Sequence, residues 1–401
     1  MSLKDELYSE LLVKIRVEVE GINARPKDFE NIELGTKYLE RVHIDPENLT
    51  DIKAGTLMPA GLKTPHGLSL GFGWNPRSPF SVESENGKFY LLEKGEKVFE
   101  IRFNERPKYY QENTSDGVPM RWMSNYNTSS KTVRVTYSNQ CALQDSGLDC
   151  KFCHAQAAHN PNNVDDQLKN PRQIGETYAK AIELDGARHF QLTGGYLPER
   201  REVEYYLDIA QALREYTGLE NFNANACVGA PGDLKVLEHY KEAGFKSIAS
   251  NLEIWDEGIF KAICPGKYKE TPGGWKHWIE ALEYAAQVFG YGEVGSNFVG
   301  GLEPKDSLLE GVEYLAEKGV VAGISVFHSV PGSGLDGHRS PIPEWYLSVA
   351  KDIYKIHKRS GFTFKQLVQC RPADSMLEAD VFRIEEGIPF EDGIAFEELR
   401  K

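Results

Sequence analysis

Three cysteines lie within one stretch of thirteen residues, Cys141 to Cys153, which holds half of the six cysteines of the chain. Two residues separate Cys150 from Cys153, Phe152 directly precedes Cys153, and eight residues separate Cys141 from Cys150. Three thiolates can each bind one iron of a [4Fe–4S] cluster and leave the fourth iron open to another ligand. The spacing therefore predicts an iron–sulfur site formed by these three cysteines.

The same stretch also fits a zinc site. The Cys150–Cys153 pair has the two-residue spacing of a zinc knuckle, and His154 or His159 would supply a further ligand. A non-enzymatic zinc-binding protein is therefore an alternative that the cysteine spacing alone does not exclude.

The composition is that of a globular protein, with 401 residues, 40% hydrophobic residues and a net charge of -14. An acidic chain offers no general basic face for nucleic acid, and no stretch approaches the ~20 apolar residues of a spanning helix. Three clustered cysteines in a long chain indicate metal binding rather than disulfides, and the first residues lack the apolar run of a signal peptide. We therefore expect a cytoplasmic protein without a nucleic-acid or membrane partner.

From residue 131 onwards the pattern alternates between strands and helices. Strands are predicted at 132–137, 189–193, 221–227, 247–253, 294–299 and 320–328, with a last strand at 364–370. Strict alternation predicts a parallel sheet with right-handed crossovers, here an α/β fold with a partial (β/α)6 TIM-type barrel. An open doubly wound sheet is the alternative, but no G-x-G-x-x-G follows the first strand.

The preceding residues, 1–125, are predicted to form an N-terminal α+β appendage. It contains a helix at 5–19, a Gly- and Pro-rich loop at 55–82 and a hairpin at 88–103. The loop around Trp74 is long and rich in glycine, which favours a lid or substrate domain. Residues 126–370 would then form the barrel, and residues 371–401 a C-terminal extension.

Several unusual residues fall at the ends of the predicted strands, where (β/α) barrels carry their chemistry. They include the cysteine loop, Gly194-Gly195, Asn251-Leu-Glu253, the segment from Asn297 to Gly301, and Val330-Pro331. Together, and in this order, they resemble the radical S-adenosylmethionine (radical SAM) superfamily over residues 131–370, nearest its biotin synthase-like branch. The first gap, between Cys141 and Cys150, is much longer than is usual in that superfamily.

The resemblance implies roles for residues at four strand ends. Phe152 would lie beside the cluster. Thr193, Gly194 and Gly195 would receive the amino group of SAM, although Tyr196 stands where a glutamate is usual. Asn251 and Glu253 would contact the ribose, and Lys267 the carboxylate. The residues expected near the adenine are Asn297, Val299, Val330 and Pro331.

The resemblance further implies a [4Fe–4S] cluster and SAM as cofactors, with flavodoxin or ferredoxin as electron donor. The cluster would cleave SAM reductively to a 5′-deoxyadenosyl radical, which abstracts hydrogen from a small-molecule substrate in cofactor or secondary metabolism. A sulfur-inserting enzyme with an auxiliary Fe–S cluster is the alternative within the superfamily, with Cys227, Cys264 or Cys370 as ligands. The residues left as candidates for catalysis are Tyr137, Tyr196, His328 and Arg371.

Overall fold

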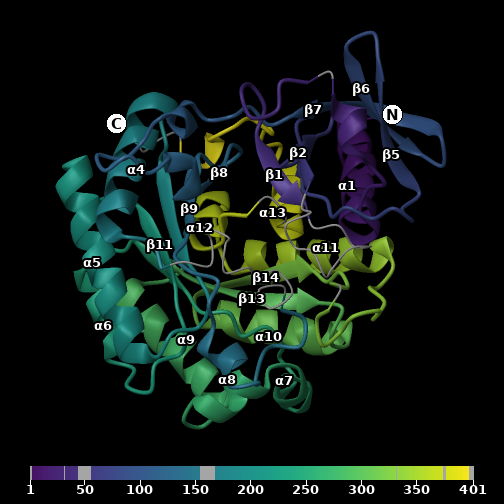
Figure 1. Ribbon diagram of the computed structural model, residues 1–401. Helices are drawn as coiled ribbons and strands as arrows, with labels where there is room; N and C mark the ends of the chain where they lie inside the picture. Colours follow the sequence, from purple (N-terminus) through teal and green to yellow (C-terminus); the bar gives the residue numbers. More distant parts are fainter. Residues whose placement is uncertain are drawn as a thin grey trace.

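The chain folds around one curved, mostly parallel sheet of seven strands, flanked by helices (Figure 1). The structure is a computed structural model, and it describes residues 2–30, 32–43, 56–153, 168–330, 332–373 and 376–396. The strand order is β14-β13-β12-β11-β10-β9-β8, so each parallel strand lies beside its neighbour in sequence. This order confirms the predicted α/β fold with a partial (β/α)6 barrel.

Six strands of this sheet are parallel, and β8 pairs with β9 in the antiparallel direction. Their bounds are β8 (Asn125–Asn127), β9 (Thr132–Thr136), β10 (His189–Thr193), β11 (Ala224–Cys227), β12 (Ser247–Ala249), β13 (Val294–Gly300) and β14 (Val320–Val326). Four predicted strands are shorter than expected: the one at 221–227 begins at Ala224, and those at 132–137, 247–253 and 320–328 end at Thr136, Ala249 and Val326.

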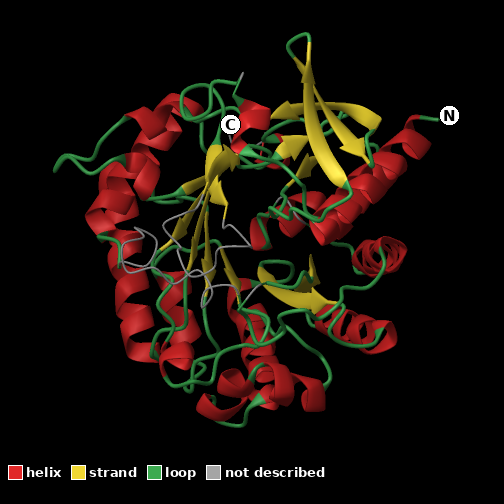
Figure 2. Ribbon diagram, turned by 45° about the vertical axis from the view of Figure 1, so that its right-hand side comes forward, coloured by secondary structure: helices red, strands yellow, loops and turns green. Residues whose placement is uncertain are grey.

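The longer helices that follow the strands cover the outer face of the sheet (Figure 2). They are α4 (Pro171–Asp185), α5 (Glu199–Thr217), α6 (Val236–Glu242), α9 (Trp275–Phe289), α10 (Lys305–Glu317) and α11 (Pro343–Arg359). The short helices α2 (Ala142–Asp145), α7 (Glu257–Ile263) and α8 (Pro265–Glu270) lie at the carboxyl ends of the strands. Local sequence explains their ends. Helix α4, for example, begins after Asn170, whose side chain accepts a hydrogen bond from Arg172 N, and ends at Gly186 in the left-handed conformation.

The strand predicted at 364–370 is wrong, because this segment is helix α12 (Phe364–Cys370). Thr363 and Gln366 form a capping box at its N-terminus, which satisfies backbone groups that a strand would leave to a neighbour. The helix packs against the inner face of the sheet: a Cβ at Gly295 of β13 would lie 2.8 Å from Cys370 O. Together with α13 (Leu377–Glu386), it therefore fills part of the half-barrel interior (Figure 1).

The N-terminal region contains helix α1 (Leu3–Glu20) and an antiparallel sheet with its own hydrophobic core. The sheet has the order β4-β3-β7-β6-β5, with bounds β3 (Leu62–Lys63), β4 (Ser69–Leu70), β5 (Phe80–Glu85), β6 (Lys88–Glu93) and β7 (Glu96–Phe103). The predicted hairpin at 88–103 is confirmed as β6 and β7. The prediction of a single loop at 55–82 is wrong, because β2 (Thr56–Pro59), β3, β4 and β5 lie there, and β2 pairs with β1 (Glu40–His43).

Helix α1 joins the N-terminal region to the barrel. Leu11 and Ile15 are fully buried in the main core, and Lys14 Nζ lies 2.8 Å from the carboxylate of Asp380 on α13. The loop around Trp74 packs against the end of α1, where Ile22 N donates to Gly73 O at 2.9 Å. The structure gives the loop these contacts, and its role as a lid stays a prediction.

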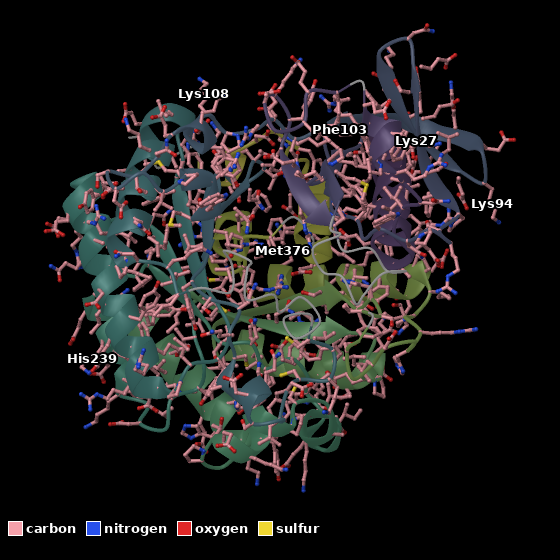
Figure 3. The ribbon with its side chains drawn as sticks, in the orientation of Figure 1. Lys27, Lys94, Phe103, Lys108, His239 and Met376 are labelled. Carbon is pink, nitrogen blue, oxygen red and sulfur yellow. The ribbon has the colours of Figure 1, made fainter. Side chains whose placement is uncertain are left out.

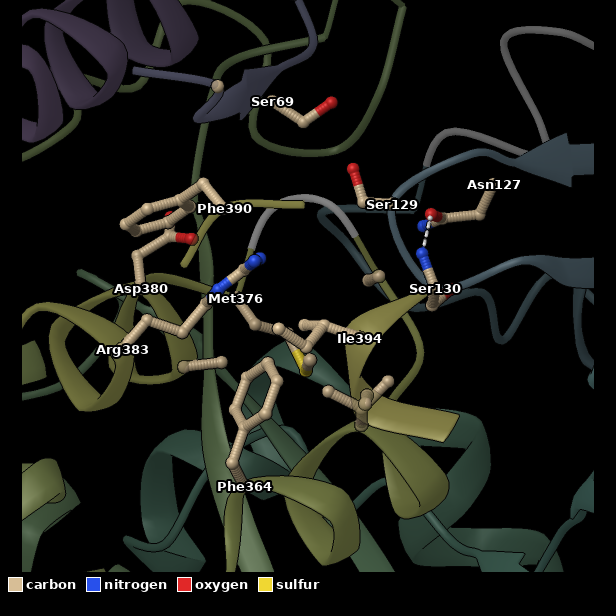
Figure 4. Close-up of a pocket in the computed structure, with 15 residues that line it drawn as sticks. Ser69, Asn127, Ser129, Ser130, Phe364, Met376, Asp380, Arg383, Phe390 and Ile394 are labelled. Carbon is tan, nitrogen blue, oxygen red and sulfur yellow. Dashed lines mark hydrogen bonds between the residues drawn. The ribbon is translucent and has the colours of Figure 1, made fainter. Parts of the chain in front are cut away.

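Figure 3 illustrates the division between core and surface: Phe103 and Met376 are buried, whereas Lys27, Lys94, Lys108 and His239 lie exposed at the periphery. Figure 4 shows a small cavity of about 40 Å³ between α12, α13 and the turn that precedes β9. Its lining contains none of the residues at the carboxyl ends of the parallel strands. Among the described helices, none combines the length and hydrophobicity required to cross a bilayer.

Candidate functional site

The cysteine loop follows β9 and is fixed by backbone hydrogen bonds to three other parts of the chain. Ala142 N donates to Tyr196 O at 2.9 Å, and Lys151 N to Ile263 O at 2.8 Å. Leu335 N donates to Lys151 O at 3.0 Å. The loop is therefore held over the carboxyl ends of the parallel strands, beside α7 and α8 and beneath the segment that follows β14.

The three predicted ligands, Cys141, Cys150 and Cys153, form no disulfide and have partly exposed side chains. A hydrogen bond from the Cys264 thiol lowers the pKa of Cys150, and the nearby Lys267 charge acts in the same direction against the effect of burial. Thiolates are the form that binds iron, so this environment favours metal binding at Cys150. Cys264 itself is completely buried, and burial raises its pKa well above the usual range.

Three cysteines on one loop form a donor set that suits a [4Fe–4S] cluster, because each thiolate binds a separate iron. Among the residues that the structure describes, no three His, Cys, Asp or Glu side chains are placed to hold one metal ion. His154 and His159, the predicted zinc ligands, lie outside the described residues.

The turn after β10 carries Thr193, Gly194 and Gly195. A Cβ at Gly194 would lie 2.5 Å from the Tyr137 ring, and one at Gly195 would clash with Gln140 O. The close approach of the loop after β9 is therefore the physical reason for both glycines. Gly194 is exposed at this edge, so the predicted contact with the amino group of SAM stays a prediction compatible with its position.

Tyr137, which we listed as a candidate for catalysis, is only 1% exposed. Its hydroxyl donates to Gly195 O at 2.6 Å, and its backbone N donates to Thr193 O at 2.8 Å. These contacts give Tyr137 a structural role, in which it joins the ends of β9 and β10.

Glu253 lies at the next part of the edge, after β12, with an unusual backbone φ of 70°. Its N donates to Asn297 O, and Val299 N donates to its carbonyl, both at 2.8 Å. Lys267 Nζ, from α8, lies 2.8 Å from Glu253 Oε1 and 2.7 Å from Asn251 O. The structure thus brings Asn251, Glu253 and Lys267 together. Their contacts with SAM stay predictions.

The charge on Lys267 is held in place by its surroundings. Burial is the largest single effect and opposes the charge, but Glu253, Cys150 and Cys264 together raise the pKa of Lys267 above its ordinary value. The ammonium group also lies 4.5 Å from the centre of the Trp278 ring. Glu253 and Lys267 thus form a fixed, partly accessible ion pair beside Cys150.

Four further predicted residues lie around this edge with different environments. His328 follows β14 and is exposed, although the surrounding protein lowers the pKa of its imidazole. Tyr196 is half-buried, and a Cβ at Gly229 would lie 3.1 Å from its ring. Phe152 packs at the edge of the main core, and Val330 is buried. Pro331 lies outside the described residues.

Arg371 is placed differently from an accessible catalytic residue. It is 9% exposed, and its guanidinium bonds Glu378, Asn297 Oδ1 and Ile324 O. Neither Glu378 nor Cys264 was singled out as a partner from the sequence, because no local pattern links either to its contact across the fold.

The remaining thiols, Cys227, Cys264 and Cys370, make separate contacts in the structure. The Cys370 thiol donates to Gly292 O at 3.2 Å, and Cys227 lies 4.0 Å from the amide of Asn251. Burial raises the pKa of Cys227 to about 11, which disfavours a thiolate there. The auxiliary Fe–S cluster stays a prediction.

Comparison with known proteins relates the site to a family. The sequence model of the Radical SAM superfamily matches residues 136–315, which include all three cysteines and the Glu253–Lys267 pair. Residues 136–315 are therefore similar to the radical SAM superfamily. The cofactors of this superfamily are a [4Fe–4S] cluster and SAM, and the three cysteines at the sheet edge, none of which forms a disulfide, fit the first of them.

One curated relative is a bacteriochlorophyllide c C-7(1)-hydroxylase of Chlorobaculum limnaeum, 29% identical over 240 residues. The match covers 56% of this chain and 59% of that relative. One similar solved structure is a methylornithine synthase, with 16% identity and a TM-score of 0.45; the match covers 64% of this chain and 69% of the other. Another is a radical SAM methyltransferase from Sphaerobacter thermophilus, with 13% identity and a TM-score of 0.44; the match covers 72% of this chain and 76% of the other. Both structural similarities are low, so the similarity to the family rests on the sequence match.

Proposed function

We propose that this protein abstracts a hydrogen atom from a small-molecule substrate in pigment, cofactor or secondary metabolism. The proposal rests mainly on one observation: three partly exposed cysteines without disulfides lie at the same edge of the sheet as the Glu253–Lys267 ion pair. When bound, the cluster and SAM supply one-electron cleavage of the sulfonium and a 5′-deoxyadenosyl radical. The residues of the chain bind, orient and shield these groups.

In this proposal Cys141, Cys150 and Cys153 hold the cluster. Glu253 accepts hydrogen bonds from ribose hydroxyls, because a carboxylate has several acceptor sites. The ammonium group of Lys267 attracts the carboxylate of SAM while it remains bonded to Glu253 and to Asn251 O. The curved sheet shields the reacting atoms from water. We also propose membership of a biotin synthase-like branch, with flavodoxin or ferredoxin as electron donor.

The name of the curated relative supplies the first substrate to test. That relative is a hydroxylase of bacteriochlorophyllide c. We therefore propose a related pigment as substrate for this chain. Sulfur insertion is less well supported, because the described thiols outside the cysteine loop make separate contacts.

The test is an anaerobic reaction of cluster-loaded protein with SAM, dithionite and bacteriochlorophyllide c deuterated at its methyl groups. The proposal predicts 5′-deoxyadenosine that carries deuterium and a pigment altered at one carbon. Deoxyadenosine without deuterium would reject this pigment as substrate. A complete lack of deoxyadenosine, in protein with a full cluster, would contradict the proposed activity.

A further inference from the structure

Arg371 has no role in the function proposed above, yet it is one of the most constrained side chains inside the half-barrel. It follows α12 and reaches toward β13 and β14 from the inner side of the sheet. Its guanidinium donates to the Glu378 carboxylate, to Asn297 Oδ1 and, at 3.2 Å, to Ile324 O. Glu378 is completely buried, and its second oxygen has no hydrogen-bond partner among the described residues.

Two glycines create the space for this arrangement. Gly323 on β14 lies opposite Asn297 on β13, and a Cβ there would clash with both Arg371 and Glu378. A Cβ at Gly295, two residues before Asn297, would lie 3.3 Å from Cγ of Arg371. The inner face of the sheet thus lacks side chains at the positions through which Arg371 reaches Asn297.

The contact with Arg371 determines how the Asn297 amide is oriented. A guanidinium has donors only, so the amide must present its oxygen to Arg371. Its Nδ2 group, with two N–H donors, must then point to the other side, where no acceptor is found among the described residues. The backbone of Asn297 is bonded to Glu253, and its side chain is partly exposed. The free donor therefore lies beside the proposed SAM site.

We propose that Arg371, held by Glu378, is a positioning residue that fixes Asn297 so that its Nδ2–H donates to SAM. The inference rests on the proposed function, because SAM is the ligand it concerns. A buried ion pair contributes little net stability compared with apolar side chains of similar size. The positioning of Asn297 is therefore a role for the Arg371–Glu378 pair that does not depend on stability.

The test removes the ion pair without leaving a buried charge. In the double variant Arg371→Met/Glu378→Leu, cluster-loaded protein should bind SAM about tenfold more weakly, the effect of losing one well-placed hydrogen bond. Asn297→Ala should lose about the same factor. Because the pair acts through Asn297, the triple variant should bind SAM as Asn297→Ala does. Iron and sulfide content should stay at the wild-type level in each variant.

A matched control is the buried pair formed by Lys14 on α1 and Asp380 on α13. Lys14→Met/Asp380→Leu also exchanges a buried pair for apolar side chains, but neither residue contacts Asn297, so the affinity for SAM should not change. Unchanged SAM affinity in the Arg371→Met/Glu378→Leu protein would overturn the proposal. Losses that multiply in the triple variant would do so too, because they would show independent effects.

A second variant keeps the proposal testable where the paired substitution prevents folding. Asn297→Asp preserves the shape and still accepts from Arg371, but it removes the N–H donor. We expect at least the same tenfold loss of SAM affinity, and wild-type affinity would reject the proposal. The failure of wild-type protein to bind SAM at all would instead reject the proposed function, so the two failures are distinguishable.

Discussion

At Glu253 the backbone adopts a φ of 70°, a conformation that costs a residue other than glycine of order 1–3 kcal/mol. Contacts from β13 on both sides and the ion pair with Lys267 hold it there. The strained backbone turns the side chain toward Lys267 and away from the strand register that residues 247–249 follow. A strained, paired carboxylate beside the cysteine loop is the arrangement expected of a ligand-binding residue.

Glu253→Gln should weaken SAM binding by about 1–3 kcal/mol, because it removes the charged acceptor and releases Lys267. Iron content should remain normal, because Glu253 is not a cluster ligand. SAM titration of the cluster-loaded protein measures the effect. Glu257→Gln, an exposed glutamate at the start of α7, is the matched control. Equal SAM affinity in the wild-type and Glu253→Gln proteins would show that the carboxylate has only a structural role.

At the scale of elements, the cysteine loop depends on its contact with α8. Gly266, in the first turn of α8, donates to Leu148 O at 3.0 Å, and a Cβ there would clash with this oxygen and approach Leu143 at 3.0 Å. The backbones of the helix and the loop are therefore in direct contact and leave no space for a side chain at Gly266. This contact also places Lys267, the next residue, beside Cys150.

We predict that Gly266→Ala displaces the loop and lowers the cluster content and SAM affinity together. The free energy of unfolding should fall by about 1–3 kcal/mol, as it does at other overpacked sites. Iron and sulfide analysis with SAM titration checks this. Gly71→Ala serves as a control, since a Cβ at Gly71 meets nothing within 4 Å. A Gly266→Ala protein with a full cluster and normal affinity would show that the loop is not held by α8.

The sequence allowed the parallel strands and the cysteine loop to be predicted because both depend on local patterns. It misled at 364–370, where Phe364, Leu367, Val368 and Cys370 fit a buried strand or a helix equally well. The capping box of Thr363 and Gln366 was the signal for a helix. The alternation in β5, Phe80–Glu85, was likewise a strand signal within a segment that its glycines and prolines led us to predict as a loop.

Contacts between distant parts of the chain could not be predicted in this way. Lys14 reaches Asp380 across 366 positions, and Arg371 reaches Asn297 across 74. No periodicity in a single sequence links such pairs. The same limit applies to Tyr137, whose position after the first strand suggested catalysis but whose burial and hydrogen bonds give it a structural role.

For the whole molecule, three buried histidines predict how stability depends on pH. Burial lowers the pKa of His43 to about 4, of His189 to about 3 and of His357 to about 4. The unfolded chain binds these protons with a pKa of about 6.5, so the folded state loses stability as the pH falls below that value. Because the unfolded chain binds the proton, each histidine should lower the free energy of unfolding by about 1.4 kcal/mol when the pH falls from 7.5 to 5.5.

Urea unfolding at pH 7.5 and 5.5 measures this dependence, with iron content checked at both values. His357→Gln should be less stable at pH 7.5, since His357 Nε2 lies 2.7 Å from Ala322 O, but should lose less stability on acidification than the wild type. Replacement of the exposed His239 by Gln is the control and should leave the pH dependence unchanged. An identical pH dependence in wild-type and His357→Gln proteins would contradict a neutral buried imidazole.

We propose that Cys141, Cys150 and Cys153 hold a cluster that donates one electron to SAM and so cleaves it. The most direct measurement compares iron, sulfide and 5′-deoxyadenosine formation in wild-type protein and in the Cys141→Ala, Cys150→Ala and Cys153→Ala variants, all reconstituted anaerobically. The buried Cys370→Ala variant is the control and should retain both cluster and SAM cleavage. We expect about four irons per chain in the wild type. Each of the three variants should lose the cluster and form no 5′-deoxyadenosine. A Cys141→Ala protein with a full cluster and undiminished SAM cleavage would contradict the proposal.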